Sequence, residues 1–177
     1  MKSLTEYVGQ KLRWQPVEDG VFELHAGEAT LATLQFRSRL GSFAIGETGA
    51  GSWTFKRMGV FRTHLTVRLD GVDVDLAIFR RGPGLTDTLH FSGGAVFTFG
   101  PTSGGSGEVA FVDARSRVLV RMRPAEELFS QEEAIEISPQ AAAVPELSVL
   151  ALLGFYVHVL QVHDEVLAAG AMAGQST

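Results

Sequence analysis

Residues 147–157 read Leu-Ser-Val-Leu-Ala-Leu-Leu-Gly-Phe-Tyr-Val, and this stretch decides the fold. Ser148 is its only clearly polar member. Pro145, just before it, suits the first turn of a helix, where a missing N–H costs no hydrogen bond. A helix that is apolar on every side must be buried on every side. The sequence therefore predicts a central helix over about 145–169, ended by Gly170, with a frayed tail over 170–177. The predicted core positions of this helix are Leu147, Leu150, Leu153, Gly154 and Val157.

A membrane span is the alternative interpretation of the same stretch. The apolar run covers 11 residues, or 14 if it is extended through His158 to Leu160, whereas a span needs about 20. No Lys or Arg follows Arg123 to anchor such a span at a membrane surface. We therefore expect a buried core helix and no transmembrane span. His158, Gln161 and Glu165 fall on one helical stripe, so we expect the second half of the helix to emerge toward water.

The chain before the helix, from about Leu12 to Ile137, has the pattern of short strands separated by turns. Residues 65–69 and 72–76 alternate apolar and polar side chains on either side of Asp70-Gly71, which is a strong hairpin signal. We expect the other strands at 21–25, 29–36, 42–46, 52–57, 87–91, 95–99, 107–112, 117–123 and 134–137. About twelve strands at this spacing indicate a barrel or sandwich.

The helix and the strands together favour the barrel. A closed sheet of about twelve strands leaves a lumen too wide for its own side chains to fill. A helix about 10 Å wide and apolar all round needs an enclosing wall. We therefore predict a mainly β fold: one domain over residues 1–177, with a closed antiparallel barrel of about twelve strands around a buried hydrophobic C-terminal helix.

Composition and charge exclude several classes of function. The 177 residues include no cysteine, which excludes disulfides, thiol catalysis and cysteine-based metal sites. Residues 124–177 carry eight acidic groups and no Lys or Arg, which argues against general nucleic-acid binding. Residues 1–10 lack the apolar core of a signal peptide, so we expect a cytoplasmic protein.

Three motifs carry a resemblance to a known family. They are Trp53-Thr54-Phe55-Lys56-Arg57, Pro145-Glu146-Leu147 and Leu152-Leu153-Gly154-Phe155-Tyr156. With many short strands before one hydrophobic helix, the chain resembles the tubby C-terminal-like superfamily, which includes the phospholipid scramblases and the LURP-one-related proteins. The resemblance is one of pattern and covers nearly the whole chain.

The resemblance implies a twelve-stranded barrel around a central C-terminal helix. For tubby proteins it also implies phosphoinositide binding through surface Lys and Arg, and for scramblases a lipid function at the membrane. Two features depart from the scramblase pattern: the palmitoylated cysteines are absent, and no calcium-loop motif precedes the helix. No family lipid-binding residue maps onto a position of this chain.

Basic residues near two predicted turns are the candidate lipid site. The turn at Met58-Gly59 is bracketed by Lys56, Arg57 and Arg62, and Arg80-Arg81 ends a neighbouring strand. Adjacent hairpins could bring these five charges into one anion-binding surface. Ordinary solvated strand ends are the competing interpretation. A second basic strand face is formed by Arg115, Arg117, Arg121 and Arg123, and acidic cross-strand neighbours are equally compatible with it.

Other residue types give weaker indications of chemistry. Asp70, Asp73 and Asp75 lack the twelve-residue loop and closing Glu of a calcium site, so we interpret them as turn and strand aspartates. The five histidines form no metal-binding spacing, and no nucleophile motif is present. Trp14 and Trp53 are expected to pack inside the barrel. We therefore expect neither metal, cofactor nor enzymatic activity.

Two functions remain open from the sequence. The first is a non-enzymatic domain, peripheral at the membrane, whose exterior binds an anionic phospholipid or phosphoinositide, or a protein partner. The second is a structural or protein-interaction module with no small-molecule ligand.

Overall fold

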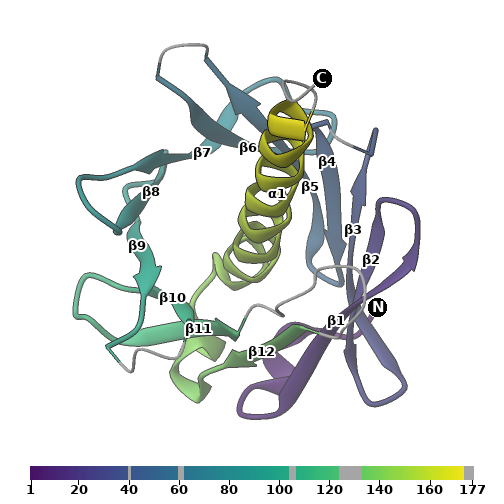
Figure 1. The fold of residues 1–177 in the computed structure, drawn as a ribbon. Helices are drawn as coiled ribbons and strands as arrows, with labels where there is room; N and C mark the ends of the chain where they lie inside the picture. Colours follow the sequence, from purple (N-terminus) through teal and green to yellow (C-terminus); the bar gives the residue numbers. More distant parts are fainter. Residues whose placement is uncertain (40, 60–61, 104–106, 124–132, 174–177) are drawn as a thin grey trace.

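Twelve strands close into an antiparallel barrel around one helix in the computed structural model, which describes residues 1–39, 41–59, 62–103, 107–123 and 133–173 (Figure 1). Each strand pairs with its neighbours in sequence, and β1 pairs with β12 to close the wall. The predicted mainly β, closed-barrel fold is thus confirmed. The strands are β1 (Lys11–Glu18), β2 (Val21–Ala26), β3 (Ala29–Phe36), β4 (Ala44–Thr48), β5 (Gly51–Met58), β6 (His64–Leu69), β7 (Asp75–Arg81), β8 (Asp87–Phe91), β9 (Val96–Pro101), β10 (Val109–Val112), β11 (Val118–Arg123) and β12 (Glu133–Ile137).

Alternation along each strand gives the barrel an apolar lining. Phe55 on β5 is paired with Val67 on β6, which is paired with Ala77 on β7, and all three side chains are buried. Their sequence neighbours point to the outer face, because successive side chains of a strand lie on opposite sides. This rule assigns each wall residue, including each basic one, either to the lumen or to the exterior of the barrel.

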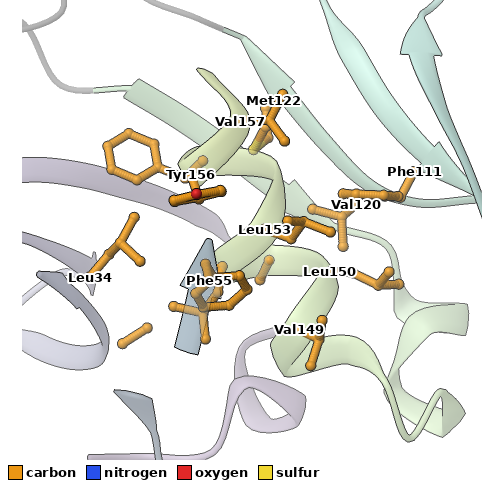
Figure 2. Packing of buried hydrophobic residues seen from close by; sticks show 14 of the residues in the cluster. Leu34, Phe55, Phe111, Val120, Met122, Val149, Leu150, Leu153, Tyr156 and Val157 are labelled. Atoms are coloured by element: carbon orange, nitrogen blue, oxygen red, sulfur yellow. The ribbon is translucent and has the colours of Figure 1, made fainter. Parts of the chain in front are cut away.

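Helix α1 (Leu147–Ala173) fills the lumen (Figures 1 and 2). Every residue from Leu147 to Leu160 is buried, including the five predicted core positions. By length and composition the helix could cross a membrane, but 83% of its most apolar 18-residue window is buried inside the protein. In Figure 2 the labelled helix residues point in several directions toward wall residues of different strands. The helix is therefore surrounded by the wall of its own chain.

The wall approaches the helix closely on one side. An added Cβ at Gly154 would lie 2.8 Å from the Cε atom of Met122 on β11, so a larger residue there would require the flexible Met122 side chain to shift. Aromatic rings fill other parts of the lumen: Trp14 stacks on Phe155 with ring centroids 4.4 Å apart, and Phe99 contacts Phe111 at 4.6 Å. The expectation that both tryptophans pack inside the barrel is confirmed, since Trp14 and Trp53 are buried.

The two ends of the barrel differ. Near the start of α1, the hydroxyl of Thr48 at the end of β4 donates a hydrogen bond of 3.1 Å to Ser148. The short 3-10 helices η1 (Leu4–Tyr7) and η2 (Pro139–Ala143) contact each other, and each buries one residue in the core. The C-terminal turns of α1 leave through the opposite end, where the connections β1–β2, β3–β4, β5–β6 and β7–β8 lie. We call this end the mouth.

Two predicted details are wrong. Strand β7 begins at Asp75 rather than 72, because the side chain of Arg68 binds both Asp73 and Asp75 and the register shifts after Val67. Helix α1 continues past Gly170 to Ala173, since one glycine between alanines costs only about 1 kcal/mol relative to alanine. Residues 174–177 of the predicted frayed tail lie outside the described residues.

Candidate functional site

The five predicted basic residues all lie near the mouth but on different faces of the wall. Arg57 follows Phe55 on the lumen side of β5, and Arg81 follows Phe79 on the lumen side of β7. Lys56 and Arg80 alternate with them and are exposed on the exterior. Arg62, also exposed, lies in the β5–β6 connection. The period of two along a strand thus prevents a single five-residue surface and gives an inner and an outer set.

The inner set lines a cleft of about 150 Å³ between α1 and the wall. Strands β5 to β8 and the connection before β6 form one side, and the last buried turn and first exposed turn of α1 form the other. Polar and charged side chains mix with apolar ones there. The lining residues are Arg57, Thr63, His64, Leu65, Phe79, Arg81, Asp87, Val157, Leu160, Gln161 and Asp164.

An ion pair between α1 and β5 dominates this cleft. Arg57 donates two hydrogen bonds to Asp164, from Nη1 to Oδ2 at 2.6 Å and from Nη2 to Oδ1 at 2.9 Å. Both side chains are partly exposed, Arg57 by 30% and Asp164 by 46%. The hydrogen bonds that Arg57 donates to Asp164 raise the pKa of Arg57, and partial burial opposes this rise. The pair uses the planar fork of a guanidinium, which matches a carboxylate or a phosphate group.

A second charged pair of residues lies across the cleft. Arg81 and Asp87 are cross-strand partners in β7 and β8. Asp87 accepts a hydrogen bond of 3.3 Å from the backbone N–H of Gly82. Burial raises the pKa of Asp87, while this hydrogen bond and the charge of Arg81 oppose the rise. The cleft thus contains two cationic and two acidic side chains.

Aromatic and imidazole groups support the helix at the mouth. The hydroxyl of Tyr156 donates a hydrogen bond of 2.5 Å to the carbonyl oxygen of Ser42, and burial raises the pKa of that hydroxyl. The buried ring of His163 packs edge-on against Phe36, with ring centroids 5.5 Å apart. Burial lowers the pKa of His163 and so favours the neutral ring.

A buried ionisable pair inside the barrel was not predicted from the sequence. His158 was expected to face water, but it is buried, and its Nε2 atom lies 2.8 Å from Oε1 of Glu133 on β12. The two atoms are within ion-pair distance without being aligned as a hydrogen bond, and neither has a hydrogen-bond partner among the described residues. The sequence contains a signal for the burial of Glu133, because Glu133 is spaced by two from Ile135 and Ile137 and therefore lies on the same inner face of β12.

Two arginines of the second basic face lie beside acidic residues. On the second basic face, Arg123 donates to Glu108, and Arg121 is the cross-strand partner of Glu136, as expected for acidic neighbours. Among the described residues, no group of three or more His, Asp or Glu side chains is arranged to hold a metal ion.

Large apolar side chains are exposed at the mouth. In the protruding turns of α1, Val166 is 54% exposed, Leu167 49% and Met172 76%. In the β7–β8 connection, directly after Arg80 and Arg81, Leu85 is 79% exposed. Figure 1 shows the outer end of α1 (yellow) at this end of the barrel. The mouth therefore combines exposed basic residues with exposed apolar ones.

Comparisons with protein-family models, with curated proteins and with solved structures find no match to this chain.

Proposed function

We propose that this protein binds anionic phospholipid surfaces through its mouth, as a peripheral membrane protein of the cytoplasm without enzymatic activity. The observation that carries the proposal is the presence, at one end of the barrel, of exposed basic side chains beside exposed large apolar ones. The resemblance to tubby-like proteins and scramblases agrees with such a function and forms part of the proposal.

The basic residues of the mouth are available to an anionic partner. Lys56, Arg62, Arg80 and Arg81 form no ion pair with another described residue. By contrast, Arg57 is already bound to Asp164. A Lys or Arg near an anionic membrane contributes roughly 1 kcal/mol to its attraction. These four residues are therefore the main electrostatic contribution in the proposal.

The apolar residues add a second contribution. Apolar side chains that enter the boundary between headgroups and acyl chains strengthen binding in proportion to the area they bury. Leu85 and Leu167 are placed for this role, since each protrudes from an element that also carries or adjoins the basic residues. A membrane-binding surface uses both charged and apolar side chains, whereas an ordinary solvated surface needs only the charged ones.

Vesicle flotation tests the proposal. The wild-type protein is expected to float with phosphatidylcholine vesicles containing phosphatidylserine or phosphatidylinositol phosphates, and to stay behind with phosphatidylcholine alone. The variant Lys56→Glu/Arg80→Glu is expected to bind at least about tenfold more weakly, because two attractive charges become repulsive. Arg57 is left unchanged, since reversing its charge would also break its pair with Asp164.

A matched variant controls for total charge. Lys11→Glu/Arg115→Glu makes the same change at exposed positions near the opposite end of the barrel, and should bind as the wild type does. Absence of binding to every anionic vesicle would overturn the proposal in favour of an interaction module without a lipid ligand. Equal losses in the two variants would show that the mouth is not the binding surface.

A further inference from the structure

We propose that the mouth cleft is a latent binding site for a phosphate monoester dianion, and that Asp164 occupies its main arginine until such an anion displaces it. This inference rests on the proposed function, because it takes a lipid headgroup as the first source of the anion. Free phosphate shares the same chemistry and serves as the second source.

The geometry of Arg57 suits this exchange. Its guanidinium is held at the rim of the lumen by β5 and presents two N–H groups in parallel, at 2.6 and 2.9 Å from the carboxylate of Asp164. A phosphate accepts the same bidentate arrangement. The pair is partly exposed, so an incoming dianion can reach the guanidinium and compete with Asp164 for it.

The other charged residues of the cleft are a second cation, Arg81, and a second acid, Asp87, which lies away from Arg57. Arg81, two strands away on the same inner face, lines the cleft and adds a second cation. Asp87 is paired across from Arg81 and accepts the backbone N–H of Gly82. Asp164 is the acid opposite Arg57 and comes from the helix, not from the wall. It is therefore the carboxylate that a ligand can move.

Displacement of Asp164 would also affect the exposed end of α1. Within the described residues, the Arg57–Asp164 pair is the only side-chain hydrogen bond between the wall and the part of α1 beyond Leu160. Breaking it removes the hydrogen bonds that tie the turns carrying Leu167 and Met172 to the wall, and both of these apolar residues are already exposed. Binding of a headgroup would thus let these side chains reorient at the membrane surface.

The test uses the full chain and compares two neighbouring acids on α1. Asp164→Ala removes the internal competitor of the proposed ligand. Glu165→Ala removes the same charge from an exposed residue that has no ion-pair partner among the described residues. Affinity for inorganic phosphate, measured by calorimetry, is expected to rise about tenfold or more in Asp164→Ala. The reason is that phosphate gains the charged hydrogen-bond donor Arg57 without having to displace Asp164. Glu165→Ala should change it less than about threefold.

A further variant assigns the gain to Arg57. In Arg57→Gln/Asp164→Ala the affinity for phosphate is expected to return to the wild-type level or below it. Equal gains in Asp164→Ala and Glu165→Ala would overturn the proposal, because the change in net charge alone would then explain the tighter binding of phosphate. A gain that persists without Arg57 would overturn it as well.

Vesicles separate this inference from the proposed function. At equal surface charge, Asp164→Ala is expected to favour phosphatidylinositol 4-phosphate, which has a phosphate monoester, over phosphatidylserine, which has none. Phosphate binding by Asp164→Ala without vesicle binding by any variant would refute the lipid function and leave the anion site. Vesicle binding that depends on Lys56 and Arg80, with no effect of Asp164→Ala, would refute the latent site and leave the lipid function.

Discussion

A chain that ends at Val144 is expected to be insoluble or to lack cooperative unfolding, with a strong gain in binding of the dye ANS. This truncation removes α1, whose side chains fill the lumen. Trp14 and Phe55 of the wall would then line an apolar void. Cavities destabilise a protein in proportion to their volume, and this one would span the whole lumen. Solubility, thermal unfolding by circular dichroism and ANS fluorescence measure the result.

A second truncation is the control for this experiment. A chain that ends at Glu165 keeps every buried residue of α1 and loses the exposed turns that follow. It is expected to unfold cooperatively, within a few degrees of the full chain. Cooperative unfolding of residues 1–144 would contradict the role assigned to the helix.

Substitution of Leu153 by Asp is expected to destabilise the protein by about 5 kcal/mol or more, because it removes a buried leucine and buries a carboxylate without a partner. Leu153 has no exposed surface, and Val120 and Phe111 of the wall lie on its side of the helix (Figure 2). A loss of this size approaches the whole stability of a typical domain, about 5–15 kcal/mol. Urea denaturation followed by circular dichroism measures it.

The same substitution at Leu167 is the matched control. Leu167 lies on the same helix but is 49% exposed, so Leu167→Asp should change stability by no more than about 0.5 kcal/mol. Similar losses at both positions would mean that the two parts of the helix share one environment, which would contradict its burial by the barrel.

The main architecture was predictable because two sequence patterns each required the other. A stretch without a polar face, residues 147–157, needed an enclosing wall, and about twelve alternating strands needed a filled lumen. The placement of α1 inside a closed barrel follows from these patterns. The resemblance to the tubby-like superfamily implied the same arrangement and stays a proposal.

Local exceptions were not predictable from such patterns. The start of β7 depends on the pairing of Arg68 with two aspartates after a register shift, although Asp70-Gly71 is a typical hairpin signal. His158 was assigned to water by its helical stripe, whereas Glu133 supplies a buried partner from a strand 25 residues earlier in the chain. Both outcomes depend on a specific side-chain partner rather than on periodicity.

The candidate site was predictable only in part. Alternation with Trp53 and Phe55 could have assigned Arg57 to the inner face and Lys56 to the outer one. The pairing of Arg57 with Asp164 could not have been found this way, since the rotation of α1 within the barrel is set by packing of the whole lumen. The separation of 107 residues between the two partners gives no local signal.

The most direct test of the account is a nuclear Overhauser measurement on monomeric protein in water, without lipid or detergent, using methionine labelled with ¹³C at its methyl group. The methyl of Met122 is expected to give a cross-peak to the α-protons of Gly154, because that methyl packs against the helix at this glycine. Absence of the cross-peak, with the Met122 methyl accessible to a soluble paramagnetic agent, would show that the helix lies outside its own barrel and would contradict the account.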